Sequence, residues 1–187
     1  MTTVYFKTNA FNVNMLSIVF MIASIPCGFM ATWLLDTLGL RISILIAAWL
    51  NFLGSLLRNV STFDIPVDAK FPVLMLGQTI AACAQPFVMF APTKLAALWF
   101  PDSQRATANM LASMSNPLGI LLANVIVPAI VSGCEESQIP LSLWVITAPS
   151  GFVTLMATFG VCSSVPPTPP TASADEASEP FLAGLKK

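Results

Sequence analysis

The sequence predicts an all-α membrane protein with five transmembrane helices, and three observations support this fold class. The 187 residues are 56% hydrophobic and only 9% charged, whereas soluble domains carry about 25% charged residues. Five stretches are predominantly apolar over the ~20 residues that a helix needs to cross a bilayer. Short polar connections separate these stretches. Because lipid offers the backbone no hydrogen bonds, each stretch is expected to be helical.

The five expected helices follow one another along most of the chain. They cover residues 13–35, 42–60, 71–99, 106–131 and 141–162. The third is long enough to tilt in the bilayer or to extend beyond it. Prolines inside the helices predict kinks, because neighbouring helices can satisfy the carbonyls that proline frees. These prolines are Pro26, Pro86, Pro92, Pro117, Pro128 and Pro149.

Composition divides the chain into three parts. Residues 1–12 are expected to form an extramembrane N-terminus, residues 13–162 a helix bundle, and residues 163–187 a disordered cytoplasmic loop or tail rich in Pro, Ser, Thr and Ala. With that tail inside, five Lys and Arg residues lie inside and three lie outside, in weak agreement with the positive-inside rule. The inner set is Arg41, Lys94, Arg105, Lys186 and Lys187, and the outer set is Lys7, Arg58 and Lys70.

Several function classes are disfavoured by what the chain lacks. It has no histidine, no GxSxG or P-loop motif and no pair of carboxylates inside a span, so it is not expected to be an enzyme. Its net charge of −1 does not suggest nucleic-acid binding. The four cysteines form no CxxC pair and are interpreted as small packing residues. No metal or cofactor is therefore expected.

The turn between the first two spans carries an unusual combination of residues. Asp36 ends one helix, Gly39 allows the reversal, and Arg41 opens the next helix. Arg41 could pair with a carboxylate or with backbone carbonyls. An ordinary charged turn is an equally good interpretation of the residues alone.

Small residues recur every fourth position in three spans, which lets helix backbones approach closely. The three sets are Ser24, Gly28 and Thr32; Gly77, Ala81 and Gln85; and Ser115, Gly119 and Ala123. They predict a packed bundle, although chance in an Ala-rich membrane chain remains an alternative.

Polar side chains at membrane depth are candidate site residues, because an unpaired amide is costly in hydrocarbon. Gln85 extends a face of small residues and precedes Pro86, which favours a cavity position. Asn109 and Asn116 are seven residues apart and share a helix face. For both residues, hydrogen bonding to another helix is favoured over a position in a cavity. Asn116 is nevertheless a candidate substrate-cavity residue, together with Gln85. For Lys94, extension to the lipid head groups is favoured over substrate contact.

Several strings carry a family resemblance. Leu34, Asp36, Gly39 and Arg41 fall on the positions of the loop motif that joins the second and third helices of major facilitator proteins, with Thr32 and Thr37 as departures from it. Further strings resemble the feline leukaemia virus subgroup C receptor-related transporters, solute carrier family 49 of that superfamily. These strings are residues 31–36, 84–85, 95–101 and 105–109. Two further strings, residues 114–119 and 164–170, look most like an orphan member of the family.

The resemblance implies the incomplete N-terminal half of a major facilitator fold, with the five spans as helices two to six of twelve. It implies that Asp36, Gly39 and Arg41 stabilise one conformation against the missing half, and that Gln85 lies at the substrate position. The expected function is part of a secondary transporter that moves a small solute by alternating access. A choline-like amine or haem is suggested by family analogy only.

The alternative function is a non-transporting helix bundle that associates with or regulates other membrane proteins. The expected partners are the lipid bilayer, a small-molecule substrate, and the missing transporter half or other membrane helices. The plasma membrane is favoured over the lysosome as the location.

Overall fold

A computed structural model describes residues 6, 8–63, 65–131 and 138–168. It contains five helices that are long and apolar enough to cross a membrane, and the described residues include no strand. They are α2 (Ala10–Thr37), α3 (Gly39–Val60), α4 (Val67–Trp99), α5 (Asp102–Ile130) and α6 (Gln138–Gly160). The predicted all-α membrane fold is confirmed.

Each helix begins three or four residues before the position predicted from hydropathy. The extra first turns carry polar or charged residues such as Asp68 in α4 and Asp102 in α5. An acidic residue in the first turn interacts favourably with the positive end of the helix dipole, although it lowers the apparent hydropathy. The prolines inside α2, α4, α5 and α6 interrupt none of these helices.

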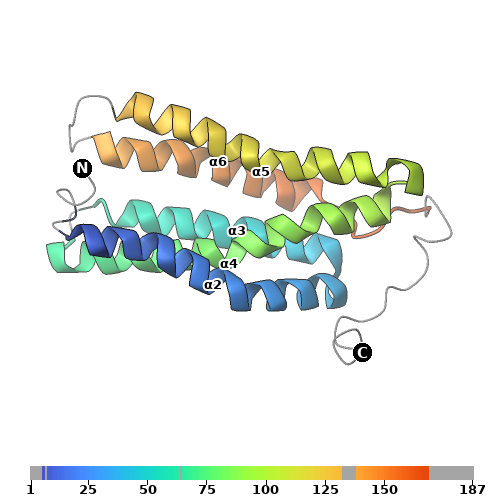
Figure 1. Ribbon diagram of the computed structural model, residues 1–187, viewed down its shortest axis with the longest axis horizontal. Helices are drawn as coiled ribbons and strands as arrows, with labels where there is room; N and C mark the ends of the chain where they lie inside the picture. The colour runs from blue at the N-terminus through green and yellow to red at the C-terminus, as the bar shows by residue number, and fades with distance from the viewer. Residues whose placement is uncertain (1–5, 7, 64, 132–137, 169–187) are drawn as a thin grey trace.

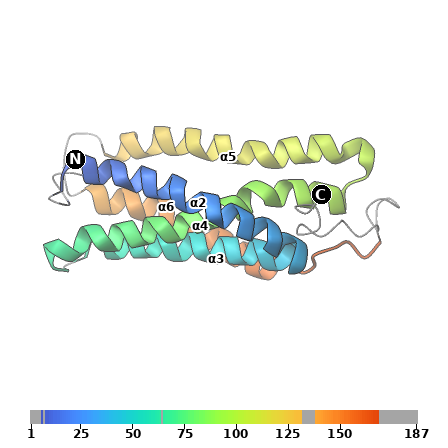
Figure 2. The same ribbon diagram turned by 60° about the horizontal axis from the view of Figure 1, so that its bottom comes forward.

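The helices lie side by side along one long axis (Figure 1). Helix α4 packs against α2, α3 and α5, while α6 packs mainly on α3. Helix α5 lies on the outside of the bundle in both views (Figure 2) and contains no buried residue. This arrangement leaves one side of the bundle, between α4, α5 and α6, less tightly filled than the α2–α3–α4 side.

Glycines set the closest approach, between α3 and α4. A Cβ atom at Gly54 would lie 2.8 Å from both the Gly77 carbonyl oxygen and the Ala81 nitrogen. A Cβ atom at Gly77 would lie 2.8 Å from the Gly54 carbonyl oxygen. The small-residue set at Gly77 and Ala81 therefore does bring two helix backbones together, as predicted.

The other two small-residue sets behave differently. A Cβ atom at Gly28 would only reach ordinary contact with Phe90, 4.0 Å away, and one at Gly119 would meet nothing within 4 Å. The prediction of close helix packing is thus wrong for the Ser115, Gly119 and Ala123 face within the described part of the chain. Spacing alone could not reveal this, because α5 presents that face to open space.

Polar side chains join α3 to α6. Asn59 donates from Nδ2 to the Thr147 hydroxyl, and Thr154 donates to the Ala48 carbonyl oxygen at 3.1 Å. Asn51 donates from Nδ2 to the Ser150 hydroxyl at 3.1 Å. Since a hydroxyl or amide in hydrocarbon is costly without a partner, these pairs favour one register between the two helices.

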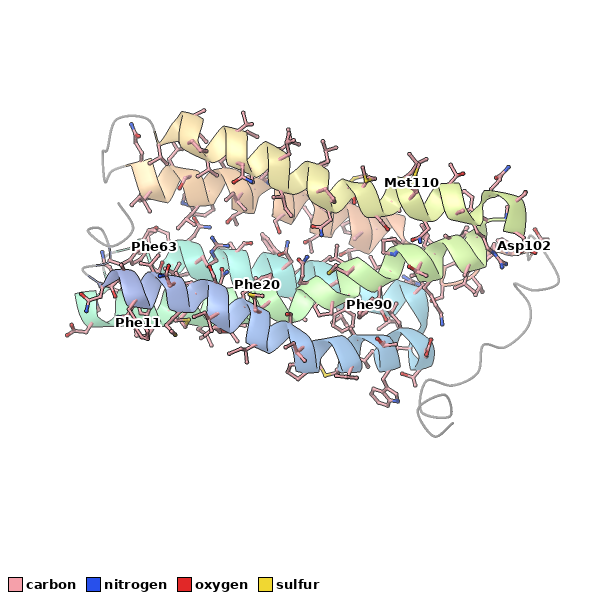
Figure 3. The ribbon with its side chains drawn as sticks, viewed as in Figure 1. Phe11, Phe20, Phe63, Phe90, Asp102 and Met110 are labelled. Atoms are coloured by element: carbon pink, nitrogen blue, oxygen red, sulfur yellow. The ribbon has the colours of Figure 1, made fainter. Side chains whose placement is uncertain are left out.

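The apolar side chains are distributed as expected for a protein in lipid. The buried core on the α2–α3–α4 side is small and consists of Ala31, Ala47 and Phe87. Large apolar side chains cover the exterior, and Figure 3 shows Phe11 and Met110 on the outer surface, 67% and 57% exposed. Of the predicted cytoplasmic segment 163–187, residues 169–187 lie outside the described residues, so its disorder stays a prediction.

Candidate functional site

The α2–α3 turn is held by the segment that follows α6. Gly39 has a φ of 82°, the left-handed conformation that the sequence predicts for this glycine. The Arg41 guanidinium donates to the Cys162 carbonyl oxygen at 2.9 Å, and the Arg41 backbone N–H donates to the Ser164 hydroxyl at 3.2 Å. The sequence analysis offers a carboxylate or a backbone carbonyl as the partner of Arg41, and in the structure the partner is a backbone carbonyl.

This contact caps the start of α3 and joins it to the segment after α6. No side chain of the preceding turn caps α3, whose N-cap residue is Leu38. Ser164 instead provides the acceptor for a first-turn N–H of α3, and Arg41 provides a donor just beyond the end of α6. The first N–H groups of a helix have no acceptor within the helix, so Ser164 satisfies one of them. The turn is also tight, because a Cβ atom at Gly39 would lie 3.1 Å from the Ser164 Oγ atom.

The structure gives Lys94 a partner that the sequence did not predict, while its extension to lipid head groups stays a prediction. Its Nζ atom lies 2.6 Å from the Asp36 Oδ1 atom and joins α4 to the end of α2. A lysine within an apolar span is more stable when a carboxylate offsets its charge. The 58 residues between the two positions explain why sequence spacing did not indicate the pair.

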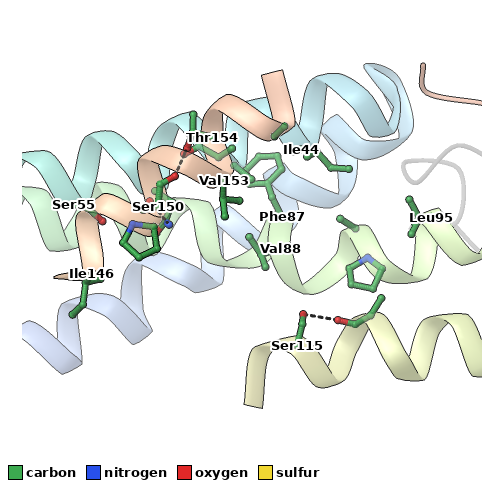
Figure 4. Close-up of a pocket in the computed structure, with 18 of the residues that line it drawn as sticks. Ile44, Ser55, Phe87, Val88, Leu95, Ser115, Ile146, Ser150, Val153 and Thr154 are labelled. Atoms are coloured by element: carbon green, nitrogen blue, oxygen red, sulfur yellow. Dashed lines mark hydrogen bonds between the residues drawn. The ribbon is translucent and has the colours of Figure 1, made fainter. Parts of the chain in front are cut away.

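A cavity of about 700 Å³ lies between α3, α4, α5 and α6. Figure 4 shows Phe87, Val88 and Leu95 of α4 on one side and Ser150, Val153 and Thr154 of α6 on another. Ala112 and Ser115 line it from α5, and the polar groups Asn51, Ser55 and Arg58 line it from α3. The volume is in the range of small-molecule sites.

The sequence-predicted cavity residues are not among those that line this space. Gln85 is half-buried on α4 between the buried residues Ala84 and Phe87, and Asn116 is half-buried on α5. Neither side-chain amide has a hydrogen-bond partner in the described part of the chain. Both amides can therefore form a hydrogen bond with a ligand or with another helix. Asn109 instead accepts from Thr93 of α4 at 3.3 Å, as the predicted bond between helices requires.

Sequence reasoning did not group the polar residues of α3 that line the cavity. Asn51, Ser55 and Arg58 are four and three residues apart, which places them on one side of a helix. That spacing is a usable signal, whereas the sequence analysis counts Arg58 only among the outer positive charges. Within the described residues, no group of three Cys, Asp or Glu side chains could hold a metal ion.

Comparisons with known proteins point to one superfamily. Residues 2–187 match the Major Facilitator Superfamily. The chain is 52% identical to solute carrier family 49 member A3 of Danio rerio over 94% of this chain and 37% of that protein. It is 47% identical to the Xenopus tropicalis protein of the same name, over 100% of this chain and 39% of that protein.

A more distant relative has a transport activity in its name. The choline/ethanolamine transporter flvcr2a of Danio rerio is 31% identical over 89% of this chain and 36% of the relative. The chain thus spans less than two fifths of the length of these curated relatives.

Proposed function

Because this chain belongs to the major facilitator superfamily, we propose that it forms part of a secondary transporter that moves a small solute by alternating access. The observation that carries the proposal is the match to this superfamily over residues 2–187, by a chain with five membrane-spanning helices. The relatives that are named choline/ethanolamine transporters support the same class of activity. No enzymatic step is part of the proposal.

In this proposal the α2–α3 turn stabilises one conformation of the transporter. Asp36 is bound to Lys94 of α4, and Arg41 is bound to the segment after α6. Gly39 allows the tight reversal between the two. A movement of α2 relative to α4, or of α3 relative to the segment after α6, would have to break these contacts, so they contribute to the free-energy difference between conformations that differ in this way.

The proposed substrate contacts are Gln85 and Asn116. Each is half-buried and has no partner for its amide among the described residues. A choline-like amine is the proposed substrate because of the names of the relatives. The proposed location is the plasma membrane.

The test compares this chain with a full-length protein that contains it, at matched surface levels in cells. Uptake of labelled choline and ethanolamine should occur with the full-length protein and be absent with the 187-residue chain. Gln85→Ala in the full-length protein should lower uptake without lowering expression, whereas Met114→Ala, on the exposed outer face of α5, should not. Unchanged uptake by Gln85→Ala would remove that residue from the site.

A second function, association with other membrane helices, is favoured by α5. No residue of this helix is buried, although it carries the small residues Ser115, Gly119 and Ala123. Such a face suits contact with another helix in lipid. If the 187-residue chain alone took up as much substrate as the full-length protein, the half-transporter proposal would be contradicted. If the chain co-purified with another membrane protein but showed no uptake, this second function would be favoured.

A further inference from the structure

Arg58 is a charged side chain in the membrane-spanning bundle for which the described chain provides no partner. It lies two residues before the end of α3. Its side chain packs on Gly77, where a Cβ atom would lie 2.9 Å from the Arg58 Cγ atom. The Arg58 Nε atom is buried and has no hydrogen-bond acceptor. An uncompensated guanidinium in this environment is costly, so it is expected to bind a group of opposite charge.

The acidic residues of the described chain do not offset this charge. Asp36 pairs with Lys94, and Asp102 pairs with Arg105 at 2.6 Å. No carboxylate oxygen of the described residues lies within 4.0 Å of the Arg58 guanidinium. A group that offsets the charge of Arg58 would therefore come from outside these residues.

Arg58 also lines the cavity between α3, α4, α5 and α6, and it is the only charged residue among the lining residues. The cavity extends along α3 from Ile44 to Arg58, which is about 20 Å at 1.5 Å per residue. Ile44 and Ser55, both of α3, are separated along the cavity in Figure 4, with Ser55 at the left and Ile44 farther to the right. Most of the lining is apolar, with Phe87, Val88, Ile146 and Val153 among the larger side chains.

Several other polar side chains of the lining already have partners within the protein. Asn51 donates to Ser150, and Thr154 donates to the carbonyl oxygens of Ala48 and Ser150. Their hydrogen-bonding capacity is largely used to join α3 to α6. A ligand in this cavity therefore meets an elongated apolar space with one unpaired cation at its end.

We infer that this cavity binds an amphiphile with a carboxylate head, with the head on the Arg58 guanidinium and the apolar tail along α3 toward Ile44. A carboxylate can accept two parallel hydrogen bonds from a guanidinium, and its single negative charge balances the single positive charge. A phosphate monoester, at about −1.5 to −2 charge, would leave excess charge in an apolar space. A choline-like cation would be repelled by Arg58. The site is therefore distinct from the proposed amine site at Gln85 and does not depend on transport.

The test measures direct binding to the purified 187-residue chain in nanodiscs of zwitterionic lipid, with empty nanodiscs subtracted. The probes are dodecanoate, dodecanol and dodecyltrimethylammonium, which share one tail and differ in the charge of the head. Dodecanoate should bind saturably and at least about tenfold more tightly than the other two, as expected when a buried charge-assisted hydrogen bond is lost. Dodecyl phosphate should bind less tightly than dodecanoate.

Two pairs of variants assign the binding to this cavity. Arg58→Gln should weaken dodecanoate binding about tenfold, whereas Arg105→Gln, which removes a positive charge paired with Asp102 outside the cavity, should not. Ser115→Phe, which fills the cavity from α5, should also weaken binding, whereas Met114→Phe on the outer face should not. If Arg58→Gln does not fold, the comparison of Ser115→Phe with Met114→Phe still tests whether binding takes place in this cavity.

Equal binding of dodecanoate and dodecanol, or binding that none of the cavity variants changes, would overturn the inference. Absence of saturable dodecanoate binding to the folded chain would overturn it as well, and would favour occupation of the cavity by another membrane helix. Choline uptake by a full-length protein is unaffected by either outcome, so the proposed function and this inference can fail separately.

Discussion

The Lys94 Nζ atom lies 2.6 Å from the Asp36 Oδ1 atom and joins the middle of the chain to the end of α2. The two side chains are 25% and 23% exposed, so neither is fully buried. The pair connects the α2–α3 turn to α4, the helix that packs on α2, α3 and α5. It is therefore placed to couple the turn to the rest of the bundle.

Removing either partner of this pair should destabilise the fold only modestly. Partly exposed ion pairs contribute up to about 1 kcal/mol, so Asp36→Asn and Lys94→Gln should each lower the free energy of unfolding in detergent micelles by about 0.5–1 kcal/mol. The double variant should lose less than the sum of the single variants, because the first change already removes the interaction. Additive losses would mean that the contact contributes no coupling energy.

The close approach of α3 and α4 should not tolerate even one added methyl group. Gly54→Ala places a Cβ atom 2.8 Å from backbone atoms of α4, which cannot move as a flexible side chain can. We expect a loss of about 1–3 kcal/mol in the free energy of unfolding, the usual cost of overpacking.

Gly119→Ala is the matched control for this substitution. A Cβ atom at Gly119 meets nothing within 4 Å, and alanine has a higher helix propensity than glycine by up to ~1 kcal/mol. The control should therefore leave the thermal midpoint unchanged or raise it. Equal effects of the two substitutions would contradict the glycine-mediated contact.

The α3–α6 contact should depend on the Thr147 hydroxyl. Thr147→Val removes the acceptor for the Asn59 amide and leaves a buried polar group without one of its partners. The expected cost is about 1–2 kcal/mol. Thr158→Val is the control, because the Thr158 hydroxyl donates only to the Thr154 carbonyl oxygen one turn earlier in the same helix. Thermal unfolding in nanodiscs should separate the two variants.

The Ser164 cap should be visible in hydrogen exchange. Ser164→Ala removes the acceptor for the Arg41 backbone N–H, so exchange at the first turn of α3 should accelerate. A cap of this kind is worth about 0.5–2 kcal/mol, which corresponds to an increase of about two- to thirtyfold in local opening. Ser163→Ala, one residue earlier in the same segment, should leave the Arg41 amide unchanged.

Much of the fold followed from local sequence properties. Hydropathy gave five helices and their order, because a chain in lipid must satisfy its backbone hydrogen bonds within each span. The left-handed turn at Gly39 followed from its place between Asp36 and Arg41. Hydropathy predicts the helix starts three or four residues too late, because polar first turns such as that of α4 reduce the apparent hydropathy.

The candidate site followed from the sequence only in part. Gln85 and Asn116 could be selected as polar residues in apolar spans, and their role remains a prediction. The spacing of Asn51, Ser55 and Arg58 indicated a common face, but it did not indicate that a cavity lies beside that face. Which amides pair with another helix, as Asn109 does with Thr93, depends on the distances between helices.

The sequence by itself determined that this protein lies in a lipid bilayer, how many spans it has and which superfamily it belongs to. Each of these is set by composition, periodicity or short motifs along the chain. Only the tertiary structure decided which of the three small-residue faces is a helix contact, that Lys94 binds Asp36, and that Arg58 lies unpaired beside a cavity. The physical reason is that spacing along a helix fixes which residues share a face, whereas the neighbour of that face is chosen by the packing of all the helices together.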